Sequence, residues 1–269
     1  MTTIVIFPGG FVKKKIMRIR YRPIGLEKAL TSVRKGGPMG RVIEITKEIF
    51  QVGGPDISDD QDASAFLIRG AERAVLIDAG AGHGSETIWH NILDRGVKPE
   101  ELSHLILTHG HVDHIGGAAY FKEKTNCLIV AHSLDREAIE TGNPSRTGAS
   151  WYGITLPTIK VDRVLTREAE EIPIGGGENI TCLHTPGHTP GSISPYLDRD
   201  GKRILFGQDI HGPFLKEFGA DMDDWRDSMR KLIALEADIL CEGHFGIYYS
   251  PPEVRAYIEQ FLRQYSKWE

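Results

Sequence analysis

Three histidines and an aspartate lie within positions 109–114, directly after the short apolar run 105–107. They follow the pattern HxHxDH and are His109, His111, Asp113 and His114. Neither a packed core nor a solvated loop needs so many imidazoles together, whereas neutral imidazole and carboxylate are ligands that suit zinc, iron or manganese. We therefore predict a fold in which the end of a buried strand delivers a metal site.

Three further candidate ligands follow later in the chain. His188 lies in the turn TPGHTPG, whose Pro and Gly residues reverse the backbone around the imidazole. Asp209 and His244 come just after the apolar runs 204–206 and 239–241. Because strand ends at one edge of a sheet bring together residues that are distant in sequence, we expect these side chains to converge on the HxHxDH motif.

With these residues the sequence resembles the metallo-β-lactamase superfamily, from about Val42 to about Phe261. The segment Leu76–Gly80 resembles the first motif of that superfamily. The resemblance implies an α/β fold, the four-layer αββα sandwich, with two divalent metal ions. Zinc is the first expectation for these ions, and iron or manganese is the alternative.

The resemblance also assigns roles to individual residues. His109, His111 and His188 would bind one metal ion, and Asp113, His114 and His244 would bind the second. Asp209 would bridge both ions. Asp78 would steady the site from behind, although a simple turn residue after a buried strand also fits that position.

The implied chemistry is hydrolysis. Two metal ions that share Asp209 would share a water molecule, whose pKa falls from about 15.7 to about 7, so that hydroxide attacks the substrate. Asp113 would bind metal and accept a proton from this nucleophile. No GxSxG motif suggests a serine nucleophile.

The other histidines carry weaker expectations. His211, two residues after Asp209, is either a residue that contacts substrate or an oxyanion, or a surface histidine. The remaining ones are expected to be structural or solvated, namely His83, His90, His104, His132 and His184.

The substrate class stays open at this point. A bridging aspartate favours the glyoxalase II and lactonase branches over true β-lactamases, which use no such residue. Only residues 245–269 follow His244, which is too few for the helical domain by which glyoxalase II proteins hold glutathione. We therefore expect a small-molecule substrate, either another thioester or a lactone.

Two other classes of function fit the same residues. Persulfide dioxygenases resemble this motif set but bind a single iron, here through His109, His188 and Asp209. A small-molecule-binding protein that kept the site and lost useful turnover is the other class, although the complete ligand set argues against it.

Composition and charge limit the classes of partner that we expect. Of the 269 residues, 40% are hydrophobic and 26% charged, as in an ordinary globular protein, and the net charge is −5. The one basic stretch is Lys13–Lys15 with Arg18, Arg20 and Arg22, which is usually a solvated run, so we expect no nucleic-acid partner.

Cysteine usage and hydropathy suggest a cytoplasmic protein. Cys127, Cys182 and Cys241 are widely spaced and are expected to be reduced and buried. No apolar run is long enough to span a bilayer, and the first residues lack the basic segment of a signal peptide, so no membrane partner is expected.

The chain is predicted to have two parts. Residues 1–40 form an N-terminal extension, with a possible strand at 4–7, that adds an edge strand, covers a groove or helps a homodimer to form. Residues 41–269 form the metallo-β-lactamase-fold domain. Within it the loop 142–160 carries Trp151 and Tyr152, which make it either a lid over the metals or a structurally anchored loop.

Hydrophobic periodicity predicts the elements of the second part. Strands are expected at 42–52, 65–69, 74–77, 105–107, 128–131, 180–184, 192–197 and 203–206, and helices at 85–95, 118–123, 132–140, 223–235 and 252–265.

Overall fold

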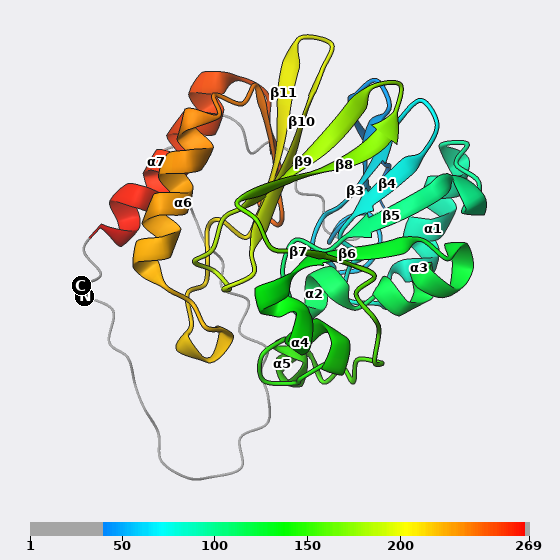
Figure 1. The fold of residues 1–269 in the computed structure, drawn as a ribbon, viewed down its shortest axis with the longest axis horizontal. Coiled ribbons are helices and arrows are strands. Elements are labelled where there is room, and N and C mark those ends of the chain that lie inside the picture. The colour runs from blue at the N-terminus through cyan, green and yellow to red at the C-terminus, as the bar shows by residue number, and fades with distance from the viewer. Residues whose placement is uncertain (1–39, 267–269) are drawn as a thin grey trace. The chain divides into compact units, whose positions relative to one another are not determined.

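Two mixed β-sheets face each other, and helices cover the outer face of each sheet (Figure 1). The computed structural model describes residues 40–266. The extension predicted for residues 1–40, with its strand at 4–7, lies outside the described residues apart from Gly40. Its boundary and role therefore stay predictions.

The first sheet has seven strands within the described residues, in the order of the sequence. They are β1 (Ile43–Thr46), β2 (Ile49–Gly53), β3 (Ala65–Arg69), β4 (Ala74–Ile77), β5 (Leu102–Ile106), β6 (Leu128–His132) and β7 (Arg163–Leu165). Strands β1 to β4 pair antiparallel, and β4 to β7 pair parallel. Every residue of β4 is buried, as is usual for a strand in the parallel part of a sheet.

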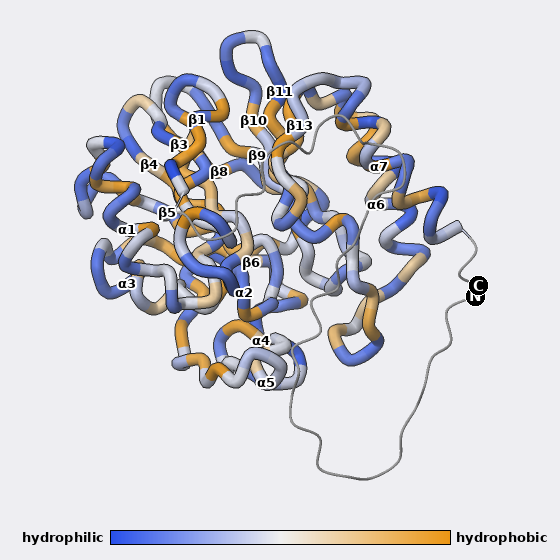
Figure 2. The backbone as a smooth tube through the Cα atoms, turned by 180° about the vertical axis from the view of Figure 1, so that it is seen from behind, coloured by the Kyte–Doolittle hydropathy of each residue, from blue (hydrophilic) through white to orange (hydrophobic). Residues whose placement is uncertain are grey.

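The second sheet has six strands within the described residues. In spatial order they are β13 (Ile247–Tyr248), β12 (Ile239–Glu242), β11 (Lys202–Gln208), β10 (Ile193–Arg199), β9 (Glu178–His184) and β8 (Ala169–Gly175). A tight turn joins β10 to β11, with Asp200 and Gly201 both at positive φ, as a two-residue hairpin requires. The tip of this hairpin is hydrophilic, whereas the strands are mostly hydrophobic (Figure 2).

The helices lie in the connections. They are α1 (Ser85–Asp94), α2 (Val112–Ile115), α3 (Ala118–Thr125), α4 (Ser133–Thr141), α5 (Ala149–Tyr152), α6 (Met222–Ala234) and α7 (Pro251–Tyr265), with 3₁₀ turns η1 (Pro99–Glu101) and η2 (Lys216–Phe218). Helices α6 and α7 pack on the second sheet, and α1 and α3 pack on the first sheet (Figure 1).

Three apolar clusters separate the four layers. Between the sheets, the rings of Phe66 and Phe206 lie 5.3 Å apart. Leu76 and Phe121 are buried between the first sheet and its helices, and Trp225 is buried between the second sheet and α6. Burial of this apolar area is the main favourable term in folding. The predicted α/β fold with an αββα layer order is confirmed.

Several predicted elements need correction. The run 42–52 is a hairpin and not one strand, because Glu48 takes a positive φ of 68° and reverses the chain between β1 and β2. The strand predicted at 105–107 begins at Leu102 and ends at Ile106. The predictions for 65–69 and 74–77 are confirmed to the residue.

Strands β7 and β8 were not predicted. In β8 the buried residues Ile172 and Ile174 alternate with exposed ones, but Pro173 and two glutamates weaken the strand signal. Within residues 40–266, no helix is long and apolar enough to cross a membrane.

Candidate metal centre

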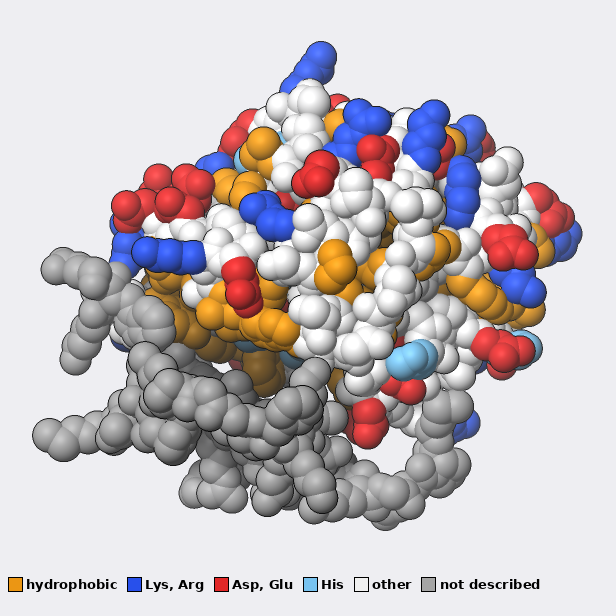
Figure 3. Space-filling model, turned by 90° about the horizontal axis from the view of Figure 1, so that it is seen from below, with side chains coloured by type: hydrophobic (Ala, Val, Ile, Leu, Met, Phe, Trp, Pro, Cys, Tyr) orange, Lys and Arg blue, Asp and Glu red, His pale blue; other side chains and the backbone are white. Residues whose placement is uncertain are grey.

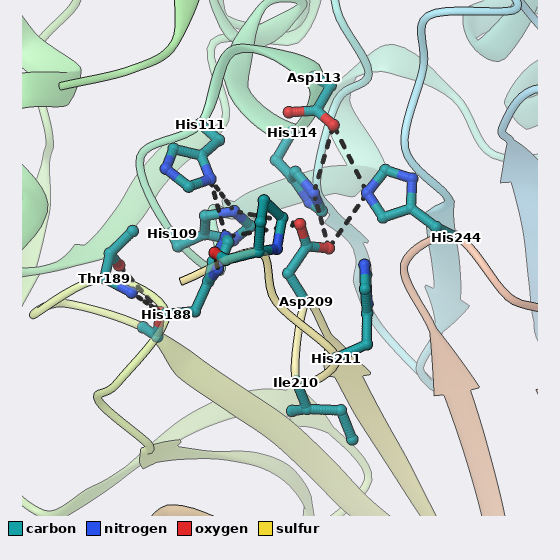
Figure 4. A network of polar contacts seen from close by, with 12 residues as sticks. His109, His111, Asp113, His114, His188, Thr189, Asp209, Ile210, His211 and His244 are labelled. Atoms are coloured by element: carbon teal, nitrogen blue, oxygen red, sulfur yellow. Dashed lines mark hydrogen bonds and ion pairs between the residues drawn. The ribbon is translucent and has the colours of Figure 1, made fainter. Parts of the chain in front are cut away.

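The predicted ligands all lie just beyond strand ends (Figure 4). His109 and His111 lie in the loop after β5, and Asp113 and His114 lie in the single turn of α2 that follows. The turn between β9 and β10 carries His188, and the ends of β11 and β12 lead to Asp209 and His244. Parallel pairing of β11 with β12 places the last two at the same edge of the second sheet.

These residues form two groups. We call His109, His111, His188 and Asp209 cluster 1, and Asp113, His114 and His244 cluster 2. Within each group the candidate ligand atoms lie within 4.8 Å of one another. The structure therefore brings together all seven side chains that the sequence proposed. The six residues expected to bind one ion each fall into the two expected groups, and Asp209, expected to bridge, groups with cluster 1.

Three imidazole nitrogens meet in cluster 1. His111 Nδ1 lies 3.0 Å from His109 Nε2 and 2.8 Å from His188 Nε2. Asp209 Oδ2 lies 3.5 Å from His188 Nε2 and 3.9 Å from His109 Nε2. All four side chains are buried.

The contacts behind His188 fix its tautomer. Its Nδ1 lies 2.9 Å from the backbone oxygen of Pro213, which only accepts a hydrogen bond, so Nδ1 carries the proton. In the neutral ring, Nε2 then has no proton, and its lone pair points toward His111.

The contacts behind His109 have the same consequence. The Thr108 hydroxyl donates to Asp78 Oδ2 at 2.7 Å, so its oxygen accepts from His109 Nδ1 at 3.2 Å. The Nε2 lone pair of His109 therefore also faces His111. Lone pairs that converge on one buried point repel each other unless a proton or a cation lies between them, which is the arrangement of a metal site.

Cluster 2 combines imidazoles with carboxylates. His114 Nδ1 donates to Asp78 Oδ2 at 2.7 Å, which directs Nε2 toward Asp209 Oδ1 at 3.2 Å and Asp113 Oδ2 at 3.9 Å. His244 Nε2 lies 3.1 Å from Asp209 Oδ1 and 3.5 Å from Asp113 Oδ2. Asp209 thus turns one oxygen to each cluster, as a bridging ligand would.

Asp78 supports both clusters. It is fully buried, and besides the Thr108 hydroxyl it accepts the backbone N–H of Thr108 at 2.8 Å. It sits at the end of β4 with a positive φ of 58°, so the turn interpretation of this residue also holds.

The two clusters have opposite protonation preferences. Burial and the neighbouring imidazoles hold the pKa of His109 and His111 well below the ordinary value, and burial lowers the pKa of His188 to about 4. Burial also opposes the charged form of His244, but the carboxylate of Asp209 outweighs it and raises the pKa to about 9. The pKa of His114 is raised well above its ordinary value for the same reason.

The surface interpretation of His211 does not hold, because its side chain is only 13% exposed, whereas a contact with substrate stays a prediction. Its Nδ1 lies 2.6 Å from Oε1 of Glu242, which is fully buried, and its ring packs edge-on against His244 with 5.5 Å between ring centroids (Figure 4). The other Glu242 oxygen accepts the backbone N–H groups of His244 and Phe245 at 2.7 and 2.8 Å. Glu242 therefore holds both His211 and the loop that presents His244.

The loop 142–160 reaches cluster 2. It contains the single turn α5, and Tyr152 lies close enough to Asp113 for the carboxylate to shift the pKa of the Tyr152 hydroxyl. Burial raises the pKa of Tyr152, and the nearby Asp113 and Asp209 add to this shift, so the hydroxyl keeps its proton at neutral pH. Whether the loop opens and closes as a lid stays a prediction.

Aromatic side chains flank the centre. Phe218 is buried against His111, with 4.2 Å between ring centroids, and Trp151 packs on Phe218 at 5.1 Å. Near cluster 2, Phe245 packs on His211 at 4.6 Å. Trp151 and Phe245 are 54% and 42% exposed.

The remaining histidines and the cysteines lie elsewhere. His104 is buried on β5, His132 stacks on His184 at 3.9 Å, and His83 and His90 are exposed, so none of the five belongs to either cluster. Cys127, Cys182 and Cys241 are buried free thiols.

Known proteins share this sequence and fold. The probable metallo-hydrolase YflN of Bacillus subtilis is 29% identical over 201 residues, which cover 63% of this chain and 74% of the relative. The acyl-coenzyme A thioesterase MBLAC2 of Gallus gallus is 27% identical over 237 residues, 78% of this chain and 80% of the relative. The crystal structure of BJP-1, a subclass B3 metallo-beta-lactamase of Bradyrhizobium japonicum, covers 85% of this chain and 93% of its own, with a TM-score of 0.72 at 22% identity, and so shows the shared fold.

The family model described as the metallo-beta-lactamase superfamily matches residues 59–244, a span that contains all seven residues of the two clusters. The chain therefore belongs to the metallo-β-lactamase superfamily, as one of its metallo-hydrolases.

Proposed function

We propose that this protein hydrolyses a small ester-like substrate, with a thioester as the first candidate and a lactone as the second, at a centre of two divalent metal ions. The observation that carries the proposal is the position of Asp209, which directs Oδ2 toward cluster 1 and Oδ1 toward cluster 2. In this proposal the second cluster, which has its own supporting contacts, holds a second ion, whereas a single-iron dioxygenase would leave its residues unused.

In this proposal, the residues of cluster 1 hold one ion and those of cluster 2 the other. Such ions supply an activated water molecule and a Lewis acid for the substrate carbonyl. Imidazole with carboxylate suits zinc, iron or manganese, and zinc is our first choice.

Asp113 and Tyr152 are the residues of this chain that we propose to handle the proton. Asp113 faces cluster 2 with Oδ2, and the Tyr152 hydroxyl lies near its carboxylate. The carboxylate accepts the proton that the attacking water loses. The Tyr152 hydroxyl keeps the carboxylate in one orientation while this happens.

The surroundings of the centre support an apolar acyl group. Trp151 and Phe245 offer exposed aromatic surface, one beside each cluster. The face seen from the side of α4 and α5 shows grouped hydrophobic side chains, with acidic and basic groups mixed around them (Figure 3). The relative MBLAC2 is named for hydrolysis of acyl-coenzyme A, so an acyl thioester is the substrate we would test first.

The test combines metal analysis with a matched substrate series. Protein purified without chelators is analysed for metal, and it is then assayed on a thioester, an oxygen ester and a lactone built on one acyl group. We expect about two ions per chain and turnover of the thioester that a chelator abolishes and added zinc restores. His90→Ala, a change to an exposed histidine outside both clusters, serves as the control.

Three results would overturn the proposal. One iron per chain with oxygen consumption would favour the persulfide dioxygenase. Tight binding of a small molecule without turnover of any substrate in the series would indicate a binding protein. Turnover that survives removal of the metal would show that the metal centre is not required for catalysis.

A further inference from the structure

We propose that Asp135 is a positioning residue that sets the spacing of cluster 1, because its carboxylate joins the two loops that carry the three histidines of that cluster. The proposal rests on the metal centre proposed above and not on the identity of the substrate. Asp135 lies in the first turn of α4, and its side chain is buried, with 1% exposure.

Its hydrogen bonds go to loops that are distant in the sequence. Oδ2 accepts the backbone N–H of Gly110 at 2.9 Å and the Thr189 hydroxyl at 2.6 Å. Oδ1 accepts the backbone N–H of Gly191 at 2.9 Å. One carboxylate therefore joins the loop after β5 to the turn between β9 and β10.

The residues that donate hydrogen bonds to Asp135 are close in sequence to the cluster 1 histidines. Gly110 lies between His109 and His111, and Thr189 follows His188 directly. A change in the separation of the two loops would therefore change the distances among the three ligand nitrogens, which are 2.8 and 3.0 Å in the structure.

A helix-stabilising role does not account for Asp135. Acidic residues near a helix N-terminus are favourable, but its three hydrogen bonds all leave α4. Among residues 40–266, Asp135 has no ion-pair partner within 4.0 Å. Burial raises the pKa of its carboxyl, and the more distant charge of Arg146 offsets this only in part. A buried carboxylate without an ion pair is unfavourable unless strong, charge-assisted hydrogen bonds offset it.

The close packing at Gly191 supports the same role. A Cβ at Gly191 would lie 2.6 Å from Cγ of Asp135, so only glycine lets the backbone approach the carboxylate this closely. Cluster 2 is held by other residues, since Asp78 supports His114 and Glu242 supports the loop of His244. Loss of Asp135 should therefore weaken cluster 1 and leave cluster 2 unaffected.

The main test is Asp135→Asn, which keeps the volume of the side chain. An amide offers one acceptor oxygen, so either orientation turns an N–H group toward a buried N–H or hydroxyl donor. A backbone hydrogen bond of 2.8 Å from Ile193 to Thr108 also joins the two segments, and the substitution leaves it in place. Glu137→Gln, on an exposed position of the same helix, is the matched control.

The readout is zinc affinity, measured by competition with a chelator in two backgrounds that each keep one cluster. In His244→Ala only cluster 1 is intact, and Asp135→Asn should weaken zinc binding about 10–100-fold, as is typical when a group that orients a ligand is removed. In His111→Ala only cluster 2 is intact, and the same substitution should change affinity by no more than about twofold.

Equal weakening in both backgrounds, or no weakening in the first, would overturn the proposal. Should Asp135→Asn not fold, Thr189→Val removes one of the three hydrogen bonds and Thr189→Ser retains it. Weaker zinc binding in the valine variant and normal binding in the serine variant support the proposal, and equal binding in both contradicts it. If the protein passes these tests but hydrolyses no thioester, the proposed substrate is wrong and the proposed role of Asp135 still stands.

Discussion

Cluster 1 and cluster 2 lie side by side and share Asp209, but they prepare for a cation in different ways. Cluster 1 offers three imidazoles, and two of these are fixed as neutral tautomers by Pro213 and Thr108. Cluster 2 places imidazoles against the carboxylates of Asp113 and Asp209. In the first, imidazole lone pairs face each other; in the second, imidazole nitrogens that hold protons at neutral pH face carboxylates.

The two also differ in access to solvent. The four side chains of cluster 1 are buried, whereas the His244 side chain is 24% exposed. Cluster 1 is therefore an enclosed site whose imidazoles are neutral. Cluster 2 lies at the more open side of the centre, and its imidazoles hold protons at neutral pH. We expect the two clusters to differ in which metal ion is lost when a ligand is mutated and in how metal affinity depends on pH.

The largest effect should come from Asp209→Asn, because it removes the carboxylate that both clusters share. Without it, neither cluster has the anionic ligand that joins them, and we expect both metal ions to be lost and activity to fall to that of the metal-free protein. Metal analysis after dialysis against metal-free buffer checks this. If one ion per chain remained, Asp209 would belong to one cluster only.

A pair of variants separates the clusters. His111→Ala should abolish binding in cluster 1 and His244→Ala binding in cluster 2, so each variant should retain one ion per chain. Activity should be lost in both while thermal unfolding of the metal-free proteins stays close to that of His90→Ala. Wild-type turnover in His111→Ala would contradict the assignment of the site.

The pH dependence of metal binding should differ between these same variants. Free imidazole binds metal, so an imidazolium must first release its proton. The pKa of His244 is about 9, so cluster 2 must release protons at pH 7, and its affinity should rise as pH rises toward 9. His188 has a pKa of about 4 and is already neutral, so the affinity of cluster 1 should change little between pH 6 and 8.

Zinc titrations at several pH values measure this contrast. In His111→Ala, which keeps cluster 2, affinity should rise about tenfold per pH unit for each proton released. In His244→Ala, which keeps cluster 1, the slope should be near zero. Equal slopes in the two variants would mean that the electrostatic difference between the clusters does not control metal binding.

The convergence of the seven candidate ligands could be predicted because they follow local rules. Each stands beside an apolar run or in a Pro–Gly turn, and these patterns are readable along the chain. The same holds for β3 and β4, whose apolar runs are continuous and bounded by turns.

Apart from Asp78, which the family resemblance indicated, the supporting residues could not be predicted, because their roles depend on contacts between distant segments. Asp135 reads as an ordinary acid on a helix, and only the docking of α4 against two loops buries its carboxylate. Tyr152 reaches Asp113 only through the path of the loop 142–160. The sequence does contain one indication for Glu242. It directly follows the apolar run 239–241, and an acidic residue buried at such a position is expected to have a buried partner, which is His211 in the structure.

The smallest expected effect concerns the open side of the centre. Tyr152→Phe removes the hydroxyl that we propose to orient Asp113 but no ligand, so metal content should stay at the wild-type value while kcat falls about tenfold. Trp151→Ala removes exposed aromatic surface and should raise KM for an apolar acyl thioester with little change in kcat. Kinetic constants and metal content measured together check both variants. If Tyr152→Phe lost metal instead, the hydroxyl would stabilise cluster 2 itself; if neither variant changed any constant, the loop would be a structural element without contact to the substrate.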